Sequence, residues 1–324
     1  MKKEQIEEII SKMTLHEKVL LCTGKNSWRT RDYEKLGIPS ILVSDGTSGV
    51  RFQIGSDQPE EMSFYDSLGG SFDNEEAMSR TYRATCFPSG SAIASSWDTE
   101  LIGEIGKKLA GECKELGINM LLGPGMNIHR NPLCGRNFEY YSEDPLLTGL
   151  CAAAETKGVQ SYKGHGTTIK HFAANNQEDN RMFTNAHISE RALREIYLKG
   201  FEIVVKTAQP YAIMTSYNLI NGTHAANHYD MLQNVARDEW GFEGFIMTDW
   251  YTSQDTTALG MVSESGKYSY SDGVQCIKAG NDLQMPGCRK NVEDIVDGVK
   301  NGRITKADLQ RCAKHILGIA LKTI

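Results

Sequence analysis

The chain has 324 residues, of which 40% are hydrophobic and 23% are charged, and its net charge is −6 at neutral pH. This length is enough for one large core, and the charge argues against a nucleic-acid or anionic-membrane partner. No run of about 18 apolar residues is present, so a membrane span is not expected. The N-terminus lacks the apolar region of a secretory signal.

The cysteines point to a reducing environment. Eight cysteines are scattered along the chain without a Cys-x-x-Cys pair. Cys113, Cys151 and Cys312 fall on the apolar side of helical patterns. We expect reduced core thiols in a cytoplasmic protein, with no zinc site and no disulfides. No sequence signal indicates a cofactor or another metal.

Helical and strand patterns alternate after two N-terminal helices, the second of which begins with the capping box Thr14–Glu17. The polar residues 52–82 are expected to form a long loop over a barrel mouth. Apolar runs predict six strands, at residues 41–46, 119–124, 169–172, 211–217, 244–250 and 282–285. Helical patterns lie between these strands, at about residues 98–116, 145–154, 189–204, 231–240 and 273–279. Two more follow the last strand, at about residues 292–299 and 305–321.

This alternation predicts parallel βαβ units. The expected fold is α/β, a (β/α)8 TIM-like barrel that fills residues 1–324 as a single domain. Six strands are fewer than the eight of a regular barrel, so either further strands are hidden in the loops or the barrel is irregular. One predicted helix, at residues 98–116, is expected to bury Leu101, Ile105, Leu109 and Cys113.

Polar side chains stand where the predicted strands end. A buried parallel strand is apolar nearly throughout, so Asp45, Lys170 with His171, and Asp249 need a reason. Each alone has an ordinary explanation, such as a turn residue, a helix cap or a solvated strand end. In a barrel, however, the carboxyl ends of the strands meet at one mouth, where catalytic residues are placed. The same mouth would receive Tyr217, Trp250, and the loop residues Arg136 and Arg181.

Four blocks of sequence resemble the barrel domain of family 3 glycoside hydrolases of the β-glucosidase and β-xylosidase type. They are residues 123–145, which contain Gly-Pro-Gly-Met-Asn-Ile-His-Arg-Asn-Pro-Leu-Cys-Gly-Arg-Asn-Phe-Glu, residues 169–178 (Ile-Lys-His-Phe-Ala-Ala-Asn-Asn-Gln-Glu), residues 214–217 and residues 244–250. The resemblance covers essentially the whole chain from Met13. Together the blocks are highly specific, whereas each alone is moderately so.

The resemblance implies a role for each residue at the mouth. Asp249 matches the catalytic nucleophile of a retaining hydrolase that acts on terminal β-D-glucosyl residues. The residues that would hold the sugar are Asp45, Arg136, Lys170, His171, Arg181, Tyr217 and Trp250, with Met214 lining the pocket. Carboxylates and cations bind hydroxyl groups, and an indole packs on the apolar face of a sugar. We also expect the cations, His171 among them, to keep nearby carboxylates ionised.

Retaining hydrolysis needs a second carboxyl group as acid and base. In the glucosidases that this chain resembles, a following α/β sandwich domain supplies it, and we expect that domain to be absent here. A second type of the family uses a histidine in the loop after the Lys-His strand, but residues 172–180 contain no histidine. The chain could be an isolated barrel, half of a split enzyme, or one in which Glu178, Asp179 or an acidic residue of 52–82 substitutes.

Two other classes compete with the hydrolase. Lys170 could form a Schiff base, as in aldolases, although its charged neighbours would keep its pKa high. A non-catalytic sugar-binding barrel would explain the missing acid. If a partner domain or chain is missing, the C-terminal helix and the rim of the mouth should expose apolar surface and favour self-association.

Overall fold

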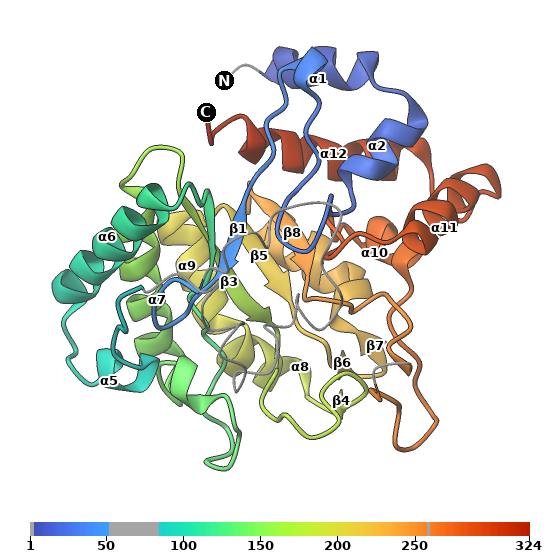
Figure 1. Ribbon diagram of the computed structural model, residues 1–324. Helices are drawn as coiled ribbons and strands as arrows, with labels where there is room; N and C mark the ends of the chain where they lie inside the picture. Colours follow the sequence, from blue (N-terminus) through green and yellow to red (C-terminus); the bar gives the residue numbers. More distant parts are fainter. Residues whose placement is uncertain (1–2, 52–83, 258–259) are drawn as a thin grey trace.

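The protein is an irregular α/β barrel with a parallel central sheet surrounded by helices (Figure 1). The computed structural model describes residues 3–51, 84–257 and 260–324, so the predicted loop at 52–82 lies outside the described residues. The five strands of the central sheet, in spatial order, are β1 (Val43–Asp45), β2 (Met120–Leu122), β3 (Gly166–Phe172), β5 (Ala212–Thr215) and β8 (Phe245–Thr248). All four pairings are parallel, as the alternation of patterns predicted.

Two irregular segments close the ring between β8 and β1. The predicted sixth strand is reduced to single bridges, in which Leu283 pairs with Met247 and Gln284 pairs with Thr23. Beyond Thr23, the N-terminal segment continues to Arg29, which pairs with Leu42 in an antiparallel bridge. The barrel is therefore completed by bridges and by one antiparallel contact. This explains why strand patterns in the sequence fall short of eight.

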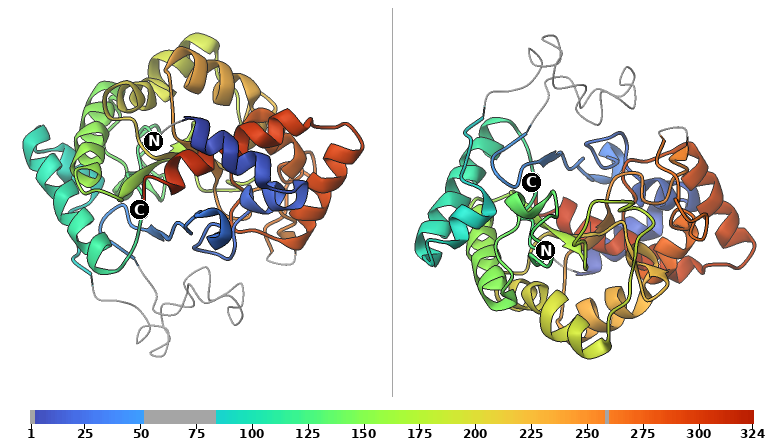
Figure 2. Two further views of the ribbon diagram at one scale, coloured as in Figure 1. Left: turned by 90° about the horizontal axis from the view of Figure 1, so that it is seen from above. Right: turned by 90° about the horizontal axis from the view of Figure 1, so that it is seen from below.

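The helices form a layer outside the sheet (Figure 2). On one side lie α6 (Thr99–Glu115), α7 (Pro145–Gln160) and α9 (Lys199–Ala208), which pack against one another in that order. The remaining helices are α1 (Lys3–Lys12), α2 (Leu15–Leu21), α5 (Gly90–Ala94), α8 (Glu190–Ala192), α10 (Gly273–Ala279), α11 (Arg289–Lys300) and α12 (Lys306–Ala320), with the π-helical segments η3 (Leu193–Tyr197) and η5 (Asp230–Glu239) and the 3₁₀ turns η1 (Glu34–Leu36), η2 (Asn137–Glu139) and η4 (Ala225–Asn227).

The buried face of α6 differs from the one predicted. Leu109 and Cys113 are buried, but Leu101 is 49% exposed and Ile102 is buried in its place. The reason is the close approach of α7, where a Cβ added at Gly106 would lie 2.4 Å from the carbonyl oxygen of Glu155. The two backbones meet over glycine, which leaves Leu101 outside the contact.

The end of the barrel where the strands begin is covered by α12. Its apolar residues are buried against α1, α2 and β8. The prediction that the C-terminal helix exposes apolar surface is therefore wrong for α12, because α1 packs across it (Figures 1 and 2). Large exposed apolar side chains lie elsewhere, including Trp97, Leu133 and Phe138.

A small three-stranded sheet follows the carboxyl ends of β3 and β5. It consists of β4 (Asn185–Ala186), β6 (Leu219–Ile220) and β7 (Thr223–His224). Each of the eight cysteines is a free thiol, and six of them are buried, including the three that were predicted in the core. Among the described residues, no helix is both long and apolar enough to cross a membrane.

Candidate active site

The predicted site residues come from the carboxyl ends of the strands and the loops that follow. Asp45 ends β1, Lys170 and His171 lie near the end of β3, and Met214 lies in β5. Asp249 and Trp250 follow β8 directly. The loops after β2, β3 and β5 carry Arg136, Arg181 and Tyr217, respectively. The contacts described below join these groups into one cluster at one end of the barrel.

Lys170 and Asp45 form an ion pair across the barrel. Lys170 Nζ lies 2.8 Å from Asp45 Oδ1, and the lysine side chain is only 5% exposed. Burial alone would raise the pKa of Asp45, but the charge and hydrogen bond of Lys170 hold it below its ordinary value. Asp45 is thus an ionised acceptor that is still 38% exposed and can bind hydroxyl groups.

The imidazole of His171 lies at the centre of the cluster. Its Nε2 is 2.9 Å from Arg136 Nη2 and 3.6 Å from Asp249 Oδ2. Burial, followed by the charges of Arg136, Lys170 and Arg181, lowers the pKa of His171 well below its ordinary value. The prediction that His171 helps to keep carboxylates ionised is therefore wrong, because the ring is neutral.

Arg136 is held on both sides by its neighbours. Its Nε donates to Glu139, a carboxylate that is 7% exposed and also accepts from the hydroxyl of Thr47 at 3.1 Å. Its Nη2 contacts His171. The pKa of Arg136 stays well above its ordinary value: burial opposes the charged form, but Tyr140 and Glu139 outweigh it. A permanent cation is thus fixed beside Asp249.

Arg181 connects the loop after β3 to Tyr217. Its guanidinium lies over the tyrosine ring, 4.9 Å from the centroid. It also donates from Nη1 to Glu178 Oε2 at 2.8 Å. This ion pair supports the ordinary explanation of Glu178 as a loop carboxylate that pairs with Arg181.

Asp249 is the buried carboxyl at the end of β8. Oδ1 accepts from the backbone N–H of Trp250 at 2.8 Å. Burial, followed by the charge of Asp249, raises the pKa of Tyr217 well above its ordinary value. Burial raises the pKa of Asp249 above its ordinary value, although Arg136, Arg181 and Lys170 oppose the shift. The group is thus less acidic than an exposed aspartate but is surrounded by three cations.

Two indoles pack together where the chain leaves β8. Trp250 is 8% exposed and donates from Nε1 to the carbonyl oxygen of Ser27 at 3.0 Å. Its ring contacts that of Trp28, with centroids 5.5 Å apart. Met214, which is 2% exposed, belongs to the same buried cluster. An aromatic surface therefore adjoins the ionic groups, as a sugar site requires.

Sequence reasoning missed three buried residues in this cluster. Asn127 and Tyr140 contact His171, and Glu139 holds Arg136. Asn127 and Glu139 are polar residues in a block that was singled out for its specificity. The signal that could have found them is their position just after β2, where side chains also turn towards the mouth.

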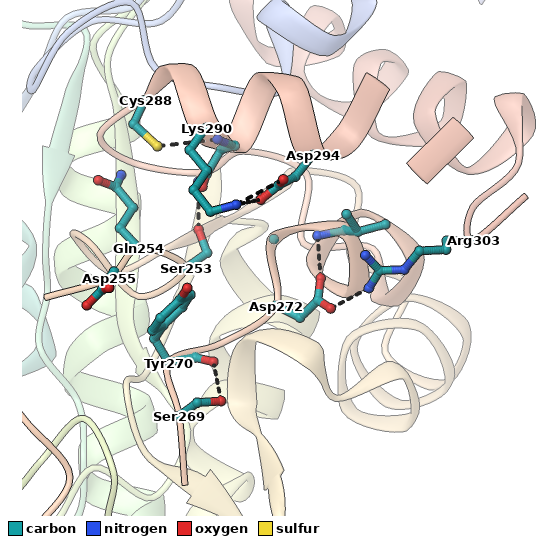
Figure 3. A pocket seen from close by; sticks show the side chains of 13 residues that line it. Ser253, Gln254, Asp255, Ser269, Tyr270, Asp272, Cys288, Lys290, Asp294 and Arg303 are labelled. Carbon is teal, nitrogen blue, oxygen red and sulfur yellow. Dashed lines mark hydrogen bonds and ion pairs between the residues drawn. The ribbon is translucent and has the colours of Figure 1, made fainter. Parts of the chain in front are cut away.

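A separate polar pocket lies between the loop after β8 and the starts of α10 and α11 (Figure 3). It contains none of the predicted site residues. Lys290 pairs with Asp294 at 2.8 Å, and Arg303 pairs with Asp272 at 2.5 Å. Both cations of this pocket are paired with neighbouring carboxylates. We therefore place the candidate active site at the cluster around Asp249 and not in this pocket.

Comparison with known proteins gives one consistent family. An exo-α-(1→6)-L-arabinopyranosidase of Bifidobacterium breve is 43% identical over 97% of this chain and 37% of that protein. A thermostable β-glucosidase B of Acetivibrio thermocellus is 41% identical over the same shares. The structure of β-glucosidase 3B from Thermotoga neapolitana in complex with glucose superposes with a TM-score of 0.82. It is 39% identical, and the match covers 98% of this chain and 42% of that one.

The chain spans little more than a third of the length of these curated relatives. The protein-family model described as the glycosyl hydrolase family 3 N terminal domain matches residues 65–319 of this chain. Sequence, fold and the cluster at the barrel mouth thus agree, and the chain belongs to glycosyl hydrolase family 3 through its N-terminal barrel domain.

Proposed function

We propose that this barrel binds a terminal β-D-glucosyl residue and cleaves its bond with retention, with Asp249 as the nucleophile. The observation that carries the proposal is the position of Asp249, a buried carboxyl at a strand end with three cations close enough to influence its pKa. The names of the relatives include both β-glucosidases and an arabinopyranosidase. Glucose is therefore the first sugar to test and xylose or arabinopyranose the next.

The mechanism divides the cluster into two roles. Asp249 attacks the anomeric carbon, and the bond to the leaving oxygen breaks as the glycosyl–enzyme ester forms. Asp45 and Lys170 would hold a pair of sugar hydroxyls, because together they offer both an acceptor and a donor. Arg136, Arg181 and Tyr217 would place further donors around the ring, and Trp250 would pack on its apolar face.

The acid and base carboxyl is proposed to come from outside the 324 residues, from a further domain or a partner chain. The greater length of the relatives supports this. Within the described part of the chain, Glu178 is engaged by Arg181 in an ion pair of 2.8 Å. We also propose that the chain can associate with a second copy of itself. The free thiols support a reducing, cytoplasmic location.

The proposal predicts different rates for two substrates. The purified chain should cleave an aryl β-glucoside slowly, because an activated leaving group departs without protonation. Cellobiose needs the missing acid, and we expect its turnover to be lower by about 10²–10⁴-fold than that of a two-carboxyl glucosidase. Rapid cellobiose turnover would show that an acid lies within this chain.

The variant Asp249→Asn tests the nucleophile in the same assay. It should abolish aryl-glucoside cleavage, because the amide cannot form the ester. The matched control is Asp255→Asn, six residues further on in an exposed loop, which should cleave at the original rate. Glucose binding without any cleavage by the original chain would favour the non-catalytic sugar-binding barrel instead.

A further inference from the structure

His171 is contacted at Nε2 by a group that can only donate. Arg136 Nη2 lies 2.9 Å away, and a guanidinium has no acceptor. A hydrogen bond at this distance therefore requires an unprotonated Nε2. The longer approach of Asp249 Oδ2, at 3.6 Å, is beyond ordinary hydrogen-bond distance.

At the other ring nitrogen, Asn127 presents a group that can only accept. Its Oδ1 accepts from the backbone N–H of His171 at 2.8 Å, and its Nδ2 donates to the carbonyl oxygen of His171 at 2.8 Å. These two bonds fix which end of the amide is the oxygen. That same Oδ1 lies 3.3 Å from Nδ1 of the ring, so Nδ1 faces an acceptor.

Tyr140 completes the contacts of Nδ1. Its hydroxyl lies 3.1 Å from Nδ1, and it accepts from Asn175 Nδ2 at 3.2 Å. Tyr140 and Asn127 are 0% and 2% exposed, respectively, so water does not compete for these bonds. A phenol can donate or accept, and with Nε2 already accepting, the hydroxyl must accept from Nδ1–H.

We propose that Asn127 and Tyr140 are positioning residues that hold His171 as the neutral Nδ1–H tautomer. The Nε2 lone pair then fixes the guanidinium of Arg136 beside Asp249. Glu139 holds the same guanidinium from its other side, so that Arg136 has one orientation. The effect on sugar binding rests on the proposed function, whereas the tautomer itself does not.

The tautomer can be measured directly by ¹⁵N NMR of the chain labelled at its histidines. The spectrum of His171→Asn identifies the signals of His171 by their loss. We expect a protonated Nδ1 and an unprotonated Nε2 whose shifts do not change between about pH 5 and 8. A proton on Nε2, or titration in the range usual for histidine, would overturn the proposal.

The variant Asn127→Asp supplies a sharper test of the same contact. A carboxylate accepts more strongly than an amide oxygen, so the Nδ1–H of His171 should be more strongly hydrogen-bonded and its ¹⁵N shift should change. An Nδ1 shift in Asn127→Asp identical to that of the original chain, with the fold intact by circular dichroism, would contradict the role given to Asn127.

Tyr140→Phe tests the second positioning residue, and Tyr141→Phe is its matched control. Both hydroxyls are buried, but that of Tyr141 donates to Glu155 at 2.6 Å and faces away from His171. Only Tyr140→Phe should shift the Nδ1 signal and weaken glucose binding, by about threefold to tenfold in calorimetry. Equal effects of the two variants would reduce Tyr140 to a packing residue and overturn its role.

The two proposals fail in different ways. If the original chain shows the Nδ1–H tautomer but binds no glucose, the proposed function fails and the positioning of His171 stands. If the chain binds glucose while Tyr140→Phe changes neither the tautomer nor the affinity, the role of Tyr140 fails and the proposed function stands.

Discussion

The reactivity expected of Asp249 depends on two opposing influences on one carboxyl group. Burial raises its pKa, whereas the charges of Arg136, Arg181 and Lys170 lower it. Only the ionised form can attack a sugar. Cleavage should therefore decline as the pH falls through the pKa of Asp249, and this acidic limb should lie above the range of an exposed aspartate.

Removing one of these cations should move the acidic limb. In Arg181→Gln, Asp249 loses a positive neighbour, so its pKa rises and the acidic limb of aryl-glucoside cleavage shifts to higher pH. The pH dependence of kcat/KM measures the shift. Arg191→Gln is the control, because Arg191 is exposed and pairs with Glu195 in its own helical segment. If the acidic limb of Arg181→Gln lies at the same pH as that of the original chain, Arg181 does not influence the pKa of Asp249.

At the residue scale, the sequence indicated which side chains would meet but not their protonation. Polar residues at the ends of buried strands are conspicuous because parallel strands are otherwise apolar. The neutral state of His171 depends on burial and on cations from two loops, which no pattern in the sequence describes. Tyr140 was missed because no pattern in the sequence distinguishes it from the adjacent Tyr141.

At the scale of elements, the helix α7 carries a buried carboxyl that the proposed chemistry does not use. Glu155 is 1% exposed, and its Oε2 accepts from Tyr141 at 2.6 Å. Burial raises the pKa of Glu155 to about 7. The folded chain therefore binds this proton more tightly than the unfolded chain, and its stability should fall as the pH rises from about 4.3 to 7.

The variant Glu155→Gln should remove this dependence. At pH 8 the amide is neutral at no cost, so the free energy of unfolding should exceed that of the original chain by on the order of 3 kcal/mol. Near pH 4 the two should be similar. Denaturant unfolding at both values measures the difference, and Glu115→Gln on the exposed face of α6 is the control. A difference in the free energy of unfolding that is equal at both pH values would contradict the raised pKa of Glu155.

Most strands and helices could be predicted from the sequence, whereas the barrel closure and the buried face of α6 could not. The five parallel strands and the capped helices carry local signals, namely apolar runs and the capping residues Thr14, Ser189 and Thr305. The closure of the barrel through bridges at Thr23 and Arg29 was not predicted, because single backbone bridges leave no periodicity. The burial of Ile102 in place of Leu101 depends on glycine contacts between two helices, which propensity does not describe.

At the scale of the whole molecule, the proposed function has the barrel supply one carboxyl of a reaction that needs two. The fold brings the residues from five strand ends and their loops to one mouth, and the family comparison agrees with that arrangement. The relatives are much longer than this chain. Formation of the glycosyl–enzyme ester, which we propose for Asp249, is therefore separable from the proton transfers that complete an ordinary turnover.

Trapping of the ester tests this separation most directly. A 2-deoxy-2-fluoro-β-glucoside with a dinitrophenyl leaving group needs no acid to react, and its ester hydrolyses slowly. We predict that mass spectrometry of the treated chain shows one covalent fluoroglucosyl group, on the peptide that contains Asp249, and none in Asp249→Asn. A folded chain that remains unlabelled, or a label on another carboxylate, would contradict the claim that Asp249 is the nucleophile.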